Sequence, residues 1–514
     1  MLPGSKGAFN GRLSEDNSSI TGYWVQPIPV VSDYPFSTPV SLKLLQHSVW
    51  SGNVSPLNDT VSLYLVVKQE TDGALVAFFR NPECAFYSKR TFQLKHDGSR
   101  VVLTNTQNKD DQLTGTYDEL TKHLSLRIPN WNSTLEQFGE TFEFTKRDRD
   151  NAVGFYPRTP ETSRYTYRQP LSEADGWQTA SLQDAGLDRK KVAAAVEKIL
   201  GSETTSGTSP YIQSLLVARH GKLVLEEYFY GFSGNRPHDL RSAGKSFTSA
   251  LVGIAIDHHA GFGLETPIYS LFPEYKHFAN PDPRKSQITV KDLLTMTSGL
   301  AGNDNDDSSP GNEMVMFAQQ ETQHDFYKYV LDLPMASAPG GKQAVYFTGG
   351  INLLGGIVRN TMKMPLDTFF DEYLAQPLDI HNYHLNLTPT GDVYGGGGLY
   401  LRPRDALKLG QLYLDGGVWN TRRVVSKNWV DLSTRRYASF NAEHGYGFAW
   451  HLFDLRFSDR VYHEYEAEGN GGQLTIVIPD LDLTVSFTTG NYGNDMTMPE
   501  RDVLAGVVSA IIEQ

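Results

Sequence analysis

The sequence predicts a chain of the α/β (α+β) class, in which an all-β antiparallel, barrel-like region precedes an antiparallel sheet flanked by helices. Three observations support this prediction. Apolar and polar residues alternate between turn signals up to about residue 150, the periodicity becomes helical after a polar linker, and strand-like runs return near the C-terminus. With 514 residues, the chain is long enough for more than one domain.

The first predicted domain, residues 1–150, carries repeated hairpin signals. An Asp-Gly pair separates two strand-like runs in VSLYLVVKQETDGALVAFFR and again in RTFQLKHDGSRVVLTN. The alternation continues through LTGTYDELTKHLSLRI and ETFEFTK without a helical stretch. Several hairpins in succession predict an antiparallel meander, either a small barrel or a sandwich.

Residues 151–184 are predicted to form a linker rich in proline and polar residues, and residues 185–514 a second domain. Asp188 can cap a helix, and two strands are predicted to turn at His220-Gly221. Strands at both ends of this domain, with helices between them, predict one antiparallel sheet. Its other expected elements are helices in KDLLTM, INLLGGIVRN, LDTFFDEYLA, RDALKLGQLYL and RDVLAGVVSAIIEQ, and strands in YGFAWHLF, RVYHEYEAE and QLTIVIPDLDLTVSF.

Composition excludes several classes of protein. The net charge of −13, with no run of Lys and Arg, disfavours nucleic acid as a partner. A single cysteine, Cys84, excludes an internal disulfide and a multi-cysteine metal site. No apolar run approaches the roughly 18 residues of a membrane span, and MLPGSKGAFNGRL lacks the apolar core of a signal peptide. We therefore expect a soluble chain, either cytoplasmic or exported after removal of a leader.

Ser242 and Lys245 stand three residues apart where a helix is predicted to begin. Residues at this spacing share a helix face, so the hydroxyl and the amine can meet over one turn. A catalytic serine needs a neighbour that takes its proton, and lysine can do so if burial or a nearby cation lowers its pKa. The competing interpretation is a helix cap followed by a solvated lysine. For a Ser-x-x-Lys motif without further evidence, this second interpretation is favoured.

Four further segments favour catalysis. They follow Ser242 in the order ITVKDLLTMTSGL, PGGKQAVYFTGGINLLGG, GGGGLYLRPRDALKLGQLYLDGGVW and GNGGQLTIVIPDLDLTV. Over about residues 185–514 the chain resembles the serine β-lactamase superfamily, in particular class C β-lactamases, family VIII carboxylesterases and 6-aminohexanoate-dimer hydrolases. The resemblance implies a β-lactamase/transpeptidase-like fold. The N-terminal meander loosely resembles the lipocalin-like barrel of some members.

The resemblance implies that Ser242 is the acylated nucleophile and that Lys245 activates it. It also implies that Tyr346, in YFT, transfers protons to and from the leaving group. A phenol becomes a useful base beside a cation, so we expect Lys245 to stabilise a Tyr346 phenolate. Taken alone, Tyr346 is better explained as a packed aromatic before a glycine turn, and the surrounding motifs favour catalysis. The expected oxyanion hole combines the Ser242 amide with an amide of residues 469–472, and which residue supplies the second amide stays open.

Two predicted substrate-binding positions depart from the superfamily pattern. Thr348 stands where the second motif has asparagine, and Asn470, followed by Gly471 and Gly472, stands near the position of a lysine or histidine. A neutral Asn470 removes an attraction for a substrate carboxylate, which favours neutral esters or amides over β-lactams and C-terminal peptides. One alternative is that Arg435 or Arg436 replaces this cation, although such arginines are usually solvated.

We predict a serine hydrolase that cleaves small carboxylic esters through an acyl-enzyme. The alternatives are an amidase or D-amino-acid peptidase, and a non-catalytic binding protein of the same fold. There is no Gly-x-Ser-x-Gly elbow, and the histidines, including His258-His259, lack a convincing zinc spacing. We therefore expect no metal and no cofactor. The N-terminal region is a possible oligomer contact.

Overall fold

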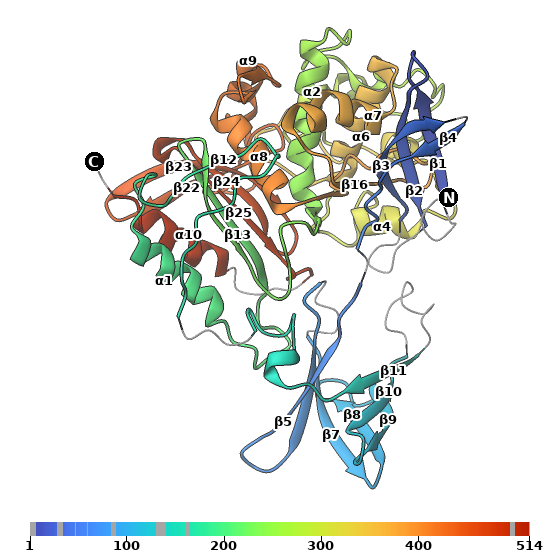
Figure 1. Cartoon of the computed structure of the whole chain (residues 1–514). Coiled ribbons are helices and arrows are strands. Elements are labelled where there is room, and N and C mark those ends of the chain that lie inside the picture. The colour runs from blue at the N-terminus through green and yellow to red at the C-terminus, as the bar shows by residue number, and fades with distance from the viewer. Residues whose placement is uncertain are drawn as a thin grey trace.

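A nine-stranded sheet lies at the centre of the larger part of the molecule (Figure 1). The computed structural model describes residues 7–27, 34–46, 48–58, 60–83, 89–129, 140–159, 164–493 and 499–512. The described strands of this sheet pair antiparallel, except that β12 runs parallel to β14. In spatial order they are β12 (Gln178–Thr179), β14 (Lys222–Tyr228), β13 (Ile212–Arg219), β25 (Leu483–Thr489), β24 (Gln473–Ile478), β23 (Arg460–Gly469), β22 (His451–Phe457), β21 (Gly445–Tyr446) and β20 (Ala438–Ser439).

Helices cover both faces of this sheet. Leu215 and Val217 of β13 pack with the helices at the two ends of the domain, α1 and α10, whereas Leu216 and Ala218 belong to the core that contains α2 and α8. None of the described helices is both long and apolar enough to cross a bilayer. The helices are α1 (Arg189–Leu200), α2 (Gly244–Asp257), α3 (Val290–Leu294), α4 (Glu313–Ala318), α5 (Phe326–Asp332), α6 (Thr348–Met362), α7 (Leu366–Phe370), α8 (Pro403–Leu414), α9 (Lys427–Ser433) and α10 (Pro499–Ser509).

The predicted meander is present over residues 64–145. Each strand pairs antiparallel with the next, and the predicted Asp-Gly turns lie at Gly73 and Gly98, whose φ angles of 87° and 55° suit glycine. Among the described pairings, none joins the first strand to the last. Cys84 lies outside the described residues. The strands are β5 (Tyr64–Gln69), β6 (Leu75–Arg80), β7 (Thr91–Asp97), β8 (Arg100–Asn105), β9 (Gln112–Asp118), β10 (His123–Arg127) and β11 (Thr141–Thr145).

The first strands of the chain lie in a different sheet from the meander. The strand β3 pairs with β16, so the N-terminal segment joins the helical side of the larger part (Figure 1). Alternation in the sequence identifies a strand but not its partner, so the single meander expected over residues 1–150 is divided between two sheets. The members of this sheet are β1 (Ala8–Leu13), β2 (Ser19–Gln26), β3 (Phe36–Gln46), β4 (Val49–Ser51), β15 (His238–Asp239), β16 (Tyr383–Asn386) and β17 (Leu399–Leu401). A short ribbon, β18 (Val418–Trp419) and β19 (Arg422–Arg423), completes the strands.

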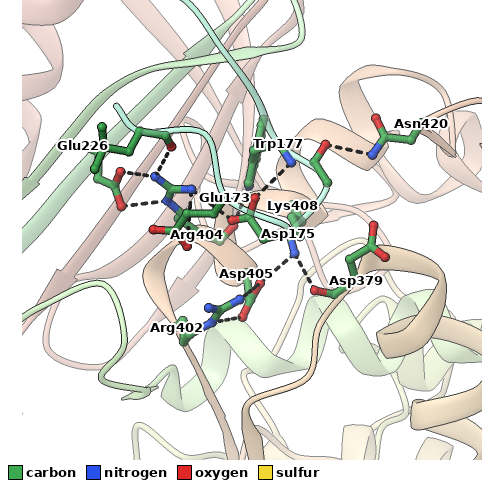
Figure 2. Close-up of polar contacts among 12 residues, drawn as sticks. Glu173, Asp175, Trp177, Glu226, Asp379, Arg402, Arg404, Asp405, Lys408 and Asn420 are labelled. Carbon is green, nitrogen blue, oxygen red and sulfur yellow. Dashed lines mark hydrogen bonds and ion pairs between the residues drawn. The ribbon is translucent and has the colours of Figure 1, made fainter. Parts of the chain in front are cut away.

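A buried ionic network attaches residues 171–177 to the nine-stranded sheet (Figure 2). The Arg404 side chain, on α8, is 3% exposed and donates to Glu226 of β14 at 2.8 Å, to Asp175 at 3.2 Å and to the Leu171 carbonyl oxygen at 2.9 Å. Trp177 in turn donates its indole N–H to the Arg404 carbonyl oxygen at 3.1 Å. The guanidinium thus neutralises two carboxylates that the fold removes from water.

We expect Arg404→Met to lower the free energy of unfolding by about 3–5 kcal/mol, because it leaves buried carboxylates without a counter-charge. Urea-induced unfolding followed by tryptophan fluorescence measures the change. The exposed Arg422 of the β18–β19 ribbon provides the matched control, and Arg422→Met is expected to unfold like the wild type. An Arg404→Met protein as stable as that control would contradict the prediction.

Candidate active site

The nucleophile predicted from the sequence lies at the entrance to a buried helix. Ser242 belongs to the short 3₁₀ turn Arg241–Ala243, which leads directly into α2. Lys245 occupies the first turn of α2, and its Nζ donates to Ser242 Oγ at 2.6 Å. A Cβ at Gly244 would lie 2.7 Å from the Gly397 carbonyl oxygen, so the close approach of the 395–398 glycine segment requires glycine at this position.

Burial determines the charge state of Lys245. The residue is 2% exposed, and burial lowers the pKa of its amine, while the carboxylates of Glu313 and Asp304 act in the opposite direction. Deprotonation of the Lys245 amine is therefore easier here than in a solvated lysine. Only a neutral amine can accept the proton of the serine hydroxyl.

Tyr346 approaches both residues from the segment that precedes α6. The Lys245 Nζ lies 5.0 Å from the centre of its ring, and the phenol interacts with Ser242 by a hydrogen bond that lowers its pKa. Burial acts more strongly and raises the pKa of Tyr346 well above its ordinary value. The environment thus favours a neutral phenol, which differs from the phenolate expected from the sequence.

Thr348, the departure in the second motif, is fully buried at the start of α6. Its amide donates to Asp304 Oδ2 at 2.6 Å, and a Cβ at Gly396 would lie 2.6 Å from its methyl group. The Asp304 amide donates to the Tyr346 carbonyl oxygen at 2.8 Å. Asp304 therefore holds the Tyr346–Thr348 turn in place, while the Thr348 side chain packs inside the protein.

The GNGG segment forms the turn between β23 and β24, next to the turn that carries Ser242. A Cβ at Gly469 would lie 3.1 Å from the Ala243 amide nitrogen, so this turn lies against the turn that carries Ser242. Gly471 and Gly472 have φ angles of 91° and 90°, which glycine adopts readily. The Asn470 side chain accepts a hydrogen bond from the Gly493 amide at 2.9 Å, which connects it to the neighbouring loop.

The structure also brings together residues that the sequence did not indicate. Glu313, at the start of α4, accepts a hydrogen bond from the Tyr394 hydroxyl at 2.6 Å and influences the pKa of Lys245. Arg241 lies beside the nucleophile, with its Nε 2.8 Å from Asp239 Oδ2 and its guanidinium over the Tyr492 ring. The acidic stretch DNDDSSPGNE, residues 304–313, begins with Asp304 and ends with Glu313, and this local excess of carboxylates is a signal that could have indicated both residues.

Of the two arginines considered as a replacement cation, Arg436 donates to the Ala442 carbonyl oxygen at 3.3 Å within its own loop. Arg435 and Arg436 are both exposed. Arg241 is thus the arginine that directly adjoins the nucleophile.

Comparisons with known proteins agree with this architecture. A 6-aminohexanoate-dimer hydrolase of Paenarthrobacter ureafaciens is 24% identical over 305 residues, which span 52% of this chain and 76% of that protein. A β-lactamase candidate from Bacteroides dorei has 16% sequence identity and a TM-score of 0.50, and the match covers 64% of this chain and 100% of that structure. The family model described as Beta-lactamase matches residues 192–508, more than half of the chain. The chain therefore belongs to the Beta-lactamase family of hydrolases, as the sequence motifs predicted.

Proposed function

We propose that this protein is a serine hydrolase that cleaves small neutral carboxylic esters by transferring their acyl group first to Ser242 and then to water. The observation that supports this most directly is the 2.6 Å contact between Lys245 Nζ and Ser242 Oγ at the end of a buried helix. Neutral Asn470 in the third motif supports uncharged substrates, because it supplies no cation for a carboxylate.

In the acylation step, the neutral Lys245 amine takes the Ser242 proton while Oγ forms a bond to the substrate carbonyl carbon. The oxyanion is stabilised by the Ser242 amide and an amide of the GNGG turn. As the carbon–oxygen bond to the leaving group breaks, the Tyr346 hydroxyl donates its proton to that oxygen and is reprotonated from Lys245. Water then attacks the acyl carbon, the carboxylic acid leaves, and Ser242 regains a proton.

Amide hydrolysis is the second candidate, because one relative is a 6-aminohexanoate-dimer hydrolase. An amine is a poorer leaving group than an alcohol and has to be protonated as it departs, so an amidase depends more on Tyr346. Matched p-nitrophenyl butyrate and butyryl p-nitroanilide distinguish the two functions. An ester is intrinsically more reactive than the matching amide. The esterase is supported if the enzyme prefers the ester by more than this intrinsic difference in reactivity.

We expect Tyr346→Phe to reduce kcat/KM for an alkyl butyrate or for butyryl p-nitroanilide by about 100-fold or more, because their leaving groups require a proton. Turnover of p-nitrophenyl butyrate should fall by less than about 10-fold, since p-nitrophenolate leaves without one. Steady-state rates of the three substrates measure this difference. Tyr437→Phe, which changes a half-buried tyrosine stacked on Phe448, is the control; equal losses for all three substrates would contradict a protonating role.

A further inference from the structure

Two histidines and a glutamate meet beside the catalytic tyrosine. His444 lies in the turn between β20 and β21, His451 begins β22, and Glu468 lies near the end of β23. His444 Nε2 is 2.7 Å from His451 Nδ1, and that same Nδ1 is 3.5 Å from Glu468 Oε2. The His451 and Tyr346 ring centres are 6.3 Å apart. This cluster therefore adjoins the active site without belonging to the Ser-Lys-Tyr group.

Hydrogen bonding does not satisfy all three groups at once. One ring nitrogen carries at most one hydrogen, so His451 Nδ1 cannot donate fully to both His444 and Glu468. If Nδ1 instead accepts from His444, its single lone pair is used, and the Glu468 oxygen 3.5 Å away receives no hydrogen from Nδ1. A cation between the three groups would give every one of these lone pairs a partner.

The separations suit a transition metal ion. Zinc bonds imidazole nitrogen and carboxylate oxygen at about 2.0–2.2 Å, so neighbouring ligand atoms of a tetrahedral ion lie about 3.3 Å apart. The three candidate ligand atoms all lie within 4.8 Å of one another. The His444–His451 separation of 2.7 Å is shorter than the tetrahedral value, and the His451–Glu468 separation of 3.5 Å is slightly longer. Small side-chain rotations therefore suffice to complete the ligand set.

The surroundings keep the two imidazoles oriented. Phe453 stacks on His444 with ring centres 4.4 Å apart, and Tyr446 meets His451 edge-on at 5.0 Å. Aromatic contacts on both rings restrict their rotation, which reduces the entropy lost on binding an ion.

Carboxylates and cations both lie close to the cluster, and Lys245 and Arg501 act on the two histidines. Glu464, Glu466 and Glu468 alternate along β23, and Arg501 binds the first two at 2.7 and 2.5 Å. Arg501 thus has two directly bonded carboxylate partners, and Glu468 is a third carboxylate that Arg501 influences without a direct hydrogen bond given for the pair. The Glu468 side chain is 33% exposed, so an ion can enter from solvent and retain water at a fourth position.

We propose that His444, His451 and Glu468 bind one divalent transition metal ion of the zinc class beside the active site. No spacing motif indicated such a site, because its ligands come from a turn and two separate strands. The bound ion places a positive charge near Tyr346, in a region where Asn470 replaces a cationic residue. Metal binding does not depend on the proposed hydrolysis, so it can also be measured in a Ser242→Ala protein.

The test titrates the chelator-treated full chain with Co²⁺, followed by visible absorption, and then displaces Co²⁺ with Zn²⁺. We expect one ion per chain, with the intense d–d bands of four- or five-coordinate cobalt. His444→Gln and Glu468→Gln each remove a ligand while changing half-buried side chains, and each should weaken binding by more than about 100-fold. Thermal melting shows whether the variants remain folded.

His463→Gln is the matched control. His463 lies on β23 as well, is exposed, and contacts Asp454 at 2.7 Å, so it offers a histidine and a carboxylate without the third ligand. Its replacement should leave the stoichiometry and affinity unchanged. Absence of stoichiometric cobalt binding by the wild type, or equal affinity in wild type, His444→Gln and Glu468→Gln, would overturn the proposal. Cobalt titration of the Ser242→Ala protein measures metal binding without catalysis, so a failure of the metal proposal can be distinguished from a failure of the proposed hydrolysis.

Discussion

Ser242→Ala is expected to reduce kcat/KM for p-nitrophenyl butyrate by about 10⁴- to 10⁶-fold and to abolish the acyl-enzyme. The substitution removes only Oγ, the atom that lies 2.6 Å from Lys245 Nζ and that would carry the acyl group. Steady-state hydrolysis and the intact mass after mixing with substrate measure both effects. Thermal melting should remain close to that of the wild type, since no other buried side chain is changed.

The control for this result is Ser249→Ala, which removes a buried hydroxyl from the same helix, seven residues further on. It is expected to retain turnover and acyl-enzyme formation. A Ser242→Ala protein with the wild-type esterase rate would exclude Ser242 as the nucleophile. In the wild type, an acyl adduct without turnover would instead favour a binding protein, and hydrolysis of a chromogenic cephalosporin would show that some cation does bind the substrate carboxylate.

Lys245→Met is expected to reduce kcat/KM by about 10³- to 10⁴-fold, because it removes the base that accepts the serine proton. Methionine has a similar length and suits a buried position, so the variant removes the amine with little change in packing. Lys245→Arg should not restore activity, because a guanidinium stays protonated and cannot accept the serine proton. Recovery of activity in the arginine variant would mean that Lys245 acts as a cation rather than as a base.

The pH dependence of the wild type tests the same role. Burial lowers the pKa of Lys245 below its ordinary value of 10.5. Below its pKa in the folded protein the amine is protonated and inactive as a base, so kcat/KM should rise with pH, with the midpoint of the rise below pH 10.5. Chelator-treated protein assayed from about pH 6 to pH 10 gives this profile. A profile that is flat, or that falls with pH, would contradict a neutral-amine base.

Much of the fold could be predicted because its signals are local. The Asp-Gly turns of the meander and the cap at Asp188, whose side chain accepts from two amides at the start of α1, depend on a few adjacent residues. The destination of β3 could not be predicted in this way. Its pairing with β16 joins residues about 350 positions apart, and alternation within a strand does not identify its partner.

The same distinction applies to the active site. Spacing alone places Ser242 and Lys245 on one helical turn, and the order of the later motifs indicated Tyr346 and the GNGG turn. The contributions of Asp304 and Glu313 were not indicated, since both act from a loop whose position relative to α2 and α6 is set by packing. The substrate-binding role predicted for Thr348 stays a prediction, and the complete burial of its side chain also depends on packing that the sequence does not show.

The meeting of a serine and a lysine at the start of an apolar helix follows from local spacing, and the motif order of the Beta-lactamase family is readable along the chain. The pKa shifts of Lys245 and Tyr346 are not, because they depend on how completely distant segments exclude water from these groups. Only the tertiary structure decided that His444, His451 and Glu468 meet. Their contact results from the pairing of β22 with β23, and a sheet register brings together residues that no sequence spacing connects.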